Sequence, residues 1–297
     1  MGRELAIAFP AARDTFAEID EALRQHLSRL MFEGPESELM LTANAQPALM
    51  AASLAALRVL TVEAGFDVRR GARFVTGHSL GEYSALAAAD ALALADAARL
   101  LKRRGLAMQR AVPVGEGAMA ALLGLELDEA RKVAEEAAQG QVCECANDNG
   151  PGQVVVSGHR EAVERAIAIA AGHGARRSIL LPVSAPFHCA LMAPAAHEME
   201  EALSQVEIRE PVVPLVANVT AAPVQDPDEI RTLLVRQVTG LVRWRECVLT
   251  MRDAGVEEIV ELGAGRVLAG LSKRIDRALA TVSLGTPADI EAFVKRL

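Results

Sequence analysis

The sequence has few aromatic residues and no excess of positive charge. Phenylalanine, tryptophan and tyrosine together supply only 3% of its 297 residues, which favours packed helices over an all-β sandwich. The formal net charge is −8, which argues against a nucleic-acid partner because phosphate binding needs a concentrated basic surface. The length is sufficient for one large α/β domain or for a domain that carries an insertion.

Cysteines and long uncharged apolar runs are also scarce. The four cysteines are too few for a disulfide framework in a chain of this length. Cys143 and Cys145 form a C-x-C pair with no second pair at zinc-ligand spacing, so we expect no metal site. Asp90 and Asp96 interrupt the most apolar helical run, and no signal peptide is recognised, so we expect no membrane partner. These features favour a cytoplasmic protein with buried free thiols.

The segment Arg73–Glu82 reads as a short strand, a Gly-x-Ser-x-Gly turn and the start of an alanine-rich helix. A serine at the tip of such a turn, here Ser79, has an exposed hydroxyl. The next backbone N–H, at the start of the helix, points to where negative charge gathers during acyl transfer. The motif predicts a nucleophilic serine; a tight turn with an idle serine is the alternative.

Turn residues divide the remaining chain into two regions. We expect a helix from Pro47 to Ala64, a strand at 73–76, helices at 81–94 and 96–111, and strands at 212–216 and 257–261. Residues 114–184 instead read as β-α-β-β-α-β, with strands at 118–124, 142–146, 154–157 and 176–181, helices at 128–138 and 161–172, and a turn cluster at 147–152. That order predicts a ferredoxin-like subdomain inserted into an α/β core of residues 1–112 and 186–297.

A serine nucleophile needs a base, and His188 is the best placed of the six histidines. It follows Pro182 and Pro186, which restrict the backbone where the chain re-enters the core. His78 is adjacent to Ser79, so its side chain is expected to point away. A buried histidine with only a structural role is the alternative for position 188.

Arg104 lies on the apolar stripe of the predicted helix 96–111, together with Leu101 and Met108. A buried guanidinium needs an anionic partner or costs several kcal/mol. The partner is either a structural Asp or Glu, or a carboxylate on the substrate. The second possibility would make the protein an acyltransferase for diacids.

Several motifs together resemble the malonyl-CoA:acyl carrier protein transacylases of bacterial fatty acid synthesis. In chain order these are Gly77-His-Ser-Leu-Gly-Glu82, Arg104-Gly-Leu-Ala-Met-Gln109, Asn149-Gly-Pro-Gly-Gln153, Phe187-His-Cys-Ala-Leu-Met192, Arg236-Gln237 and Gly263-Ala-Gly-Arg-Val-Leu268. The resemblance spans essentially the whole chain. It implies an α/β-hydrolase-like core with a parallel sheet and a ferredoxin-like insert, and malonyl transfer to acyl carrier protein in fatty acid synthesis without a cofactor.

The resemblance also implies site roles. Ser79 would be the acyl-accepting nucleophile and His188 its general base and acid, while Arg104 would hold the malonyl carboxylate. The N–H of Leu80 would serve the oxyanion, and the main-chain carbonyl of Gln237 would orient the histidine. Gln46 and Phe187 would line the acyl pocket, with Phe187 favouring malonyl over branched acyl groups. Malonyl-CoA and acyl carrier protein are the implied partners, and the family suggests a monomer.

One difference from the family pattern concerns the first residues. Family members open with a strand and a Gly-Gln-Gly-Ser-Gln loop whose glutamine amide completes the oxyanion hole, whereas Met1-Gly-Arg-Glu-Leu5 resembles the helix that follows. We therefore expect the first strand and this loop to be missing from the core, and a catalytically impaired form is one alternative. The others are the acyltransferase of a malonate decarboxylase or of a polyketide pathway, and a plain serine hydrolase.

Overall fold

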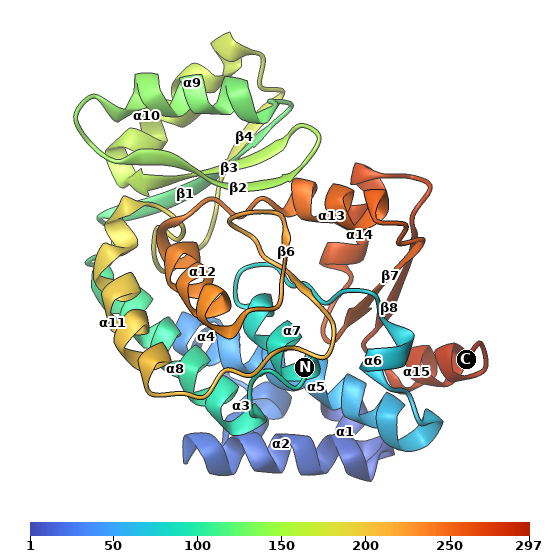
Figure 1. Ribbon diagram of the computed structural model, residues 1–297. Helices are drawn as coiled ribbons and strands as arrows, with labels where there is room; N and C mark the ends of the chain where they lie inside the picture. Colours follow the sequence, from blue (N-terminus) through green and yellow to red (C-terminus); the bar gives the residue numbers. More distant parts are fainter.

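The computed structural model describes residues 1–297 as a mixed α/β protein with parallel and antiparallel sheets. Figure 1 shows a small sheet with two helices at one end and a larger, mostly helical part below it. The N-terminal helices, which the sequence patterns did not delimit, are α1 (Arg3–Ala8), α2 (Pro10–Leu23), α3 (Leu27–Glu33) and α4 (Glu36–Leu39). Helices α2, α3 and α4 pack on the central helix α5 (Thr42–Ala64), and α1 packs on α2, so the larger core is built mainly from helix–helix contacts.

Helix α5 begins five residues earlier than expected, at Thr42, so Pro47 lies inside it and not at its first turn. It packs closely on α8 (Leu94–Ala111) at Gly105, where a Cβ would come within 2.5 Å of the Cα of Ala43. Helix α5 is long and apolar enough to cross a membrane by length and composition. However, most of its apolar stretch is buried inside the protein, as in the core helix of a globular fold.

The small sheet contains the predicted β-α-β-β-α-β succession. Its elements are β1 (Gly117–Leu123), α9 (Leu127–Ala138), β2 (Cys143–Gly150), β3 (Gln153–His159), α10 (Arg160–Ala170) with the short 3₁₀ turn η1 (Ala171–His173), and β4 (Arg177–Leu180). The strands are antiparallel in the order β2-β3-β1-β4. The predicted turn at 147–152 is wrong in its extent, because β2 continues through Gly150 and the turn narrows to Pro151–Gly152.

Alternation along the strands gives this sheet two apolar faces. Ala118, Ala120 and Leu122 of β1 face α9 and α10, whereas Met119 and Ala121 belong to a second cluster on the opposite face. Phe187, from the segment that leads back into the larger part, packs against that second cluster. The small sheet therefore contributes one wall beside the residues that follow it in the chain.

The parallel pairing in the larger part is less extensive than predicted. Only β7 (Glu258–Leu262) and β8 (Ala280–Leu284) form a parallel pair of strands, and the expected strand at 73–76 is a single bridge from Val75 to Leu215. The expected strand at 212–216 is reduced to β5 (Leu215–Val216), which pairs with β6 (Pro223–Val224). Pro211 and Pro214 have no N–H to donate, which limits ladder formation in this segment.

The remaining helices surround these short strands. They are α6 (Val68–Gly71), α7 (Gly81–Ala88), η2 (Ala190–Met192), α11 (Ala193–Ser204), α12 (Pro227–Thr239), α13 (Trp244–Asp253), α14 (Val267–Ile275) and α15 (Pro287–Val294). The predicted split between two helices near residue 96 is confirmed, but α7 ends at Ala88, before the left-handed Asp90. Helices α7, α8 and α12 each carry a residue of the site described next.

Candidate active site

The turn between Val75 and α7 holds Ser79 in a left-handed conformation with φ of 53°. Glycine is required at position 77, because a Cβ there would lie 2.1 Å from the carbonyl carbon of Gly81. Asn218 supports the turn from both sides: its Oδ1 accepts the N–H of Ser79 at 2.8 Å, and its Nδ2 donates to the carbonyl of Gly77 at 2.9 Å. The strained serine conformation is thus fixed by packing and by hydrogen bonds.

The structure brings Ser79 and His188 together although 109 residues separate them in the chain. Ser79 Oγ lies 2.7 Å from His188 Nε2, and His188 Nδ1 lies 2.8 Å from the main-chain carbonyl of Gln237. A carbonyl oxygen can only accept, so Nδ1 carries the proton and Nε2 presents a lone pair to the serine hydroxyl. This is the tautomer that a general base for Ser79 requires.

Burial keeps this imidazole neutral. His188 is only 3% exposed, and burial, reinforced by the positive charge of Arg104, lowers its pKa to about 3. The hydrogen bond to Gln237 opposes the shift but does not cancel it. At neutral pH the side chain is therefore free to take a proton.

Arg104 lies beside the serine hydroxyl, on the buried face of α8, and is 1% exposed. Its Nη2 donates to Ser79 Oγ at 3.1 Å and to Gln237 Oε1 at 2.9 Å, and its Nη1 donates to Gln46 Oε1 at 2.8 Å. Its partners are neutral oxygens and its Nε–H has none, while the carboxyl group of Glu82 acts on it only at longer range, beyond Gln237. Of the two alternatives for Arg104, a direct ion pair with a structural acid is therefore excluded, and a buried cation faces the Ser79 hydroxyl.

Burial also lowers the pKa of Arg104, while nearby Tyr83 and Glu82 oppose that shift. The guanidinium carbon lies 5.8 Å from the ring centroid of Tyr83, an arrangement that stabilises a cation over an aromatic face. These contacts keep the charge in place without neutralising it.

The remaining predicted residues lie around the same three groups. Gln46 is 5% exposed and its Nε2 contacts Met108 Sδ at 3.6 Å, so its oxygen is directed to Arg104. Phe187 is half-buried and directly precedes His188 in the chain. The N–H of Leu80 donates no hydrogen bond within the protein and lies at the start of α7. All seven predicted positions thus belong to one neighbourhood.

Two buried residues of this neighbourhood had no role assigned from the sequence. Glu82 accepts the N–H of Asn218 through Oε1 and the Nε2 of Gln237 through Oε2, both at 2.5 Å. Burial raises the pKa of Glu82 to about 8, against the opposing effect of these hydrogen bonds and of the Arg104 charge. Glu82 closes the Gly77–Glu82 motif, which was the only signal for it; no local pattern marks Asn218.

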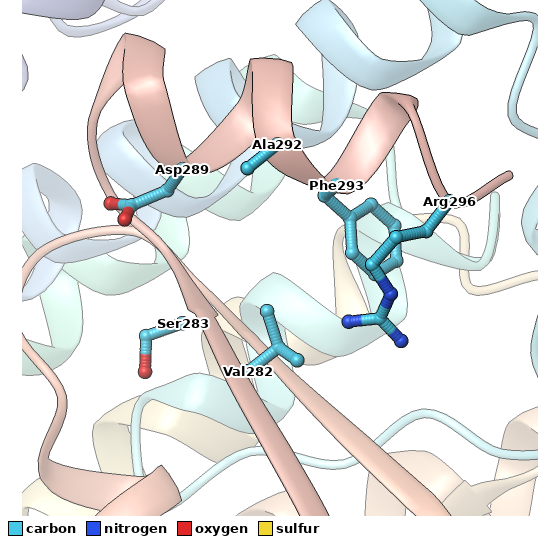
Figure 2. A pocket seen from close by; sticks show the side chains of 6 residues that line it. All are labelled: Val282, Ser283, Asp289, Ala292, Phe293 and Arg296. Carbon is cyan, nitrogen blue, oxygen red and sulfur yellow. The ribbon is translucent and has the colours of Figure 1, made fainter.

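Other candidate groups lie outside the site. His78 points away from Ser79, as expected, and its Nε2 lies 2.8 Å from Asn149 Oδ1 of the small sheet. The four cysteines are free thiols, and no cluster of three or more His, Cys, Asp or Glu side chains is arranged to hold a metal ion. Figure 2 shows a hollow between β8 and α15 that is lined by Val282, Ser283, Asp289, Ala292, Phe293 and Arg296, none of which belongs to the site.

Comparison with known proteins places this site in a family. Residues 1–282 match the family model described as an acyl transferase domain. The chain belongs to this acyl transferase family. The resemblance seen in its motifs is confirmed by the malonyl CoA-acyl carrier protein transacylase of Escherichia coli (strain K12), which is 45% identical over 292 residues, covering 98% of this chain and 93% of the relative.

Solved structures agree with this assignment. The acyl-carrier-protein-S-malonyltransferase from Bartonella henselae superposes with a TM-score of 0.97 at 51% identity, covering 100% of this chain and 94% of that one. A malonyl-transacylase in complex with its type II PKS acyl-carrier protein superposes with a TM-score of 0.96 at 42% identity, covering 100% of this chain and 95% of that one. The mixed α/β architecture is therefore shared with solved members of the family.

Proposed function

We propose that this acyltransferase moves a malonyl group from malonyl-CoA to the pantetheine thiol of an acyl carrier protein, in fatty acid synthesis, through a malonyl-serine at position 79. The observation that carries the proposal is the position of Arg104, a buried cation without an acidic partner that contacts the nucleophilic hydroxyl. A thioesterase or lipase that acts on uncharged acyl chains has no use for a cation there. A free carboxylate on the acyl group supplies the missing negative charge.

In the first step, His188 Nε2 takes the proton of Ser79 as its Oγ attacks the thioester carbonyl, and the N–H of Leu80 stabilises the oxyanion. The imidazolium then gives the proton to the departing CoA thiolate. Arg104 binds the distal carboxylate, with Gln46 and the side chain of Gln237 as its neutral partners in the unloaded site. Phe187 narrows the pocket beside the malonyl methylene and disfavours branched acyl groups.

In the second step the carrier's pantetheine thiol enters, His188 takes its proton, and the thiolate attacks the malonyl-serine ester. Ser79 leaves with the proton returned by His188, and malonyl-carrier is released. Both steps exchange an acyl group and a proton, so the proposal invokes neither a metal nor a redox cofactor. The transacylase relatives and the solved complex of a malonyl-transacylase with its acyl-carrier protein support the carrier as acceptor.

We further propose the finer architecture expected from the sequence. Residues 114–184 would form a ferredoxin-like subdomain, supported by the strand order β2-β3-β1-β4 with α9 and α10 on one face. Residues 1–112 and 186–297 would form an α/β-hydrolase-like core, supported by the strained serine at a turn before α7. A monomeric, cytoplasmic enzyme is part of the same proposal.

The test is mass spectrometry of the intact protein after incubation with malonyl-CoA. We expect a mass increase equal to one malonyl group, absent in the variant Ser79→Ala and removed from the wild type by holo-acyl carrier protein. A second acceptor, free pantetheine, measures how far the carrier itself is recognised. An adduct that persists in Ser79→Ala, or no adduct on the wild type, would refute the proposal.

A further inference from the structure

A buried carboxylate lies directly behind the nucleophile and takes no part in the proton transfers described above. Glu82, in the first turn of α7, is 1% exposed, and the charge of Arg104 acts on it only at longer range. Its two oxygens accept from Asn218 N–H and from Gln237 Nε2, each at 2.5 Å. Burying a carboxyl group costs free energy unless hydrogen bonds compensate, which indicates that these two donors matter for more than packing.

Both partners of Glu82 hold groups that react or bind the acyl chain. Gln237 accepts from His188 through its main-chain carbonyl and from Arg104 through Oε1. Its Nε2 also donates to the main-chain carbonyl of Ser79 at 2.9 Å. One residue therefore connects the elbow and the cation through its side chain and the base through its main-chain carbonyl.

Asn218 fixes the other side of the elbow. Its Oδ1 accepts the N–H of Ser79 and its Nδ2 donates to the carbonyl of Gly77, so its amide orientation is determined by these two contacts. Its own backbone N–H is held by Glu82. The segment after β5 and the end of α12 thus meet at a single carboxylate on α7.

We propose that Glu82 is a positioning residue for acyl transfer: it sets Gln237, and through it both His188 and Arg104, relative to Ser79. The inference rests on the proposed malonyl transfer and deepens it. Glu82 touches neither substrate nor a reacting atom; it acts through Asn218 and Gln237, which hold the residues that do.

The chemistry of the contacts explains why an acid is needed at this position. Both partners of Glu82 donate, and each oxygen of a carboxyl group can accept a hydrogen bond, whether the group is ionised or carries a proton on one oxygen. An amide at position 82 retains one acceptor and turns an NH₂ group toward a donor. If the side chain of Gln237 rotates to present its oxygen, its own NH₂ then faces the guanidinium of Arg104, so the mismatch is passed to the carboxylate-binding group.

The experiment compares Glu82→Gln with Asp148→Asn, the same change at another buried carboxyl. Asp148 is 3% exposed and one of its oxygens has no hydrogen-bond partner, so an amide there meets no opposing donor. Acylation of each protein is followed by rapid quench and intact mass spectrometry, over a range of malonyl-CoA and, separately, acetyl-CoA concentrations. The final adduct stoichiometry gives the active fraction, and every rate is expressed per active enzyme.

For Glu82→Gln we expect the acylation rate constant to fall at least about tenfold with both acyl groups, because the His188 acceptor is displaced. We expect the half-saturating concentration to rise several-fold for malonyl-CoA only, because acetyl has no carboxylate for Arg104 to bind. Asp148→Asn should match the wild type in both quantities.

Two results would overturn the inference. One is a Glu82→Gln enzyme whose rates per active molecule equal those of Asp148→Asn. The other is a loss that is identical for the two acyl groups and leaves both half-saturating concentrations unchanged, which is the signature of a merely structural role. If Glu82→Gln does not fold, Glu82→Asp takes its place. The aspartate keeps the carboxyl group but is too short to reach both donors, so the same malonyl-specific pattern is expected. Without that pattern the inference fails. Failure of the proposed function itself would be seen separately, as a wild type that forms no malonyl adduct.

Discussion

Removing the buried cation at position 104 is the perturbation that most directly tests the site. In Arg104→Ala the acyl pocket loses its only group able to pair with a carboxylate, since Gln46 and Gln237 present their oxygens toward this position. Breaking a buried ion pair by removing one partner costs about 3–5 kcal/mol. At 1.4 kcal/mol per tenfold, that corresponds to a fall of roughly 10² to 4 × 10³ in kcat/KM for malonyl-CoA.

Acetyl-CoA provides the internal control, because its acyl group has no carboxylate to lose. Its kcat/KM should stay within about threefold of the wild-type value, so the malonyl-to-acetyl ratio falls by roughly two orders of magnitude. Arg104→Lys should recover part of the malonyl activity, because an ammonium keeps the charge but cannot bond both carboxylate oxygens in one plane. The two thioesters are compared in a single coupled assay for CoA release in the presence of holo-acyl carrier protein.

Equal losses for malonyl and acetyl would refute the reasoning. That result would mean that Arg104 acts through its contact with the serine hydroxyl, 3.1 Å away, or through folding of the site, and not through the substrate's carboxylate. A thermal melt of each variant separates the two causes. A melting temperature near that of the wild type, with equal kinetic losses, assigns the effect to the hydroxyl contact.

Three further outcomes are expected. Since the pKa of His188 is lowered to about 3, the acylation rate at pH 5 should stay within threefold of that at pH 7 in stopped-flow measurements. An imidazole with pKa 6.5 would retain only about 4% of its pH 7 rate, and such a loss would contradict the burial argument. As the pH falls, His188 takes up a proton in the unfolded chain before it does so in the folded one. The free energy of unfolding, measured with urea, should therefore fall as the pH drops from 6.5 toward 3. A rise over this window would show that the folded imidazole is charged. Gly77→Ala should lower stability by about 1–3 kcal/mol and abolish acylation, because its Cβ meets the backbone of Gly81 at 2.1 Å; an unchanged melting temperature would mean that the turn is not as tight as described.

The local structure around Ser79 and Arg104 could be predicted from the sequence, whereas the chemical roles of these residues stay predictions. The Gly-x-Ser-x-Gly spacing predicts the elbow, since glycine at 77 is forced by contact with Gly81, and the periodicity of 96–111 correctly places Arg104 on a buried face. The order of strands and helices between 114 and 184 also follows from local alternation and turn chemistry. These properties depend on residues within a few positions of each other, so they can be predicted from the sequence pattern.

Long-range pairing decided the rest. Whether Val75 lies in a strand depends on Leu215, which is 140 residues away and directly follows Pro214, so the expected parallel strands are reduced to a bridge. The proton position on His188 is set by the main-chain carbonyl of Gln237. The neutral partners of the Arg104 guanidinium are set by the packing of α5, α8 and α12. No local pattern marks Asn218, and the motif that contains Glu82 does not indicate its role, because the role of each residue depends on its contacts with distant segments. Residue chemistry and periodicity are encoded along the chain, but a hydrogen-bond partner is chosen only when separate segments are brought within about 3 Å of each other.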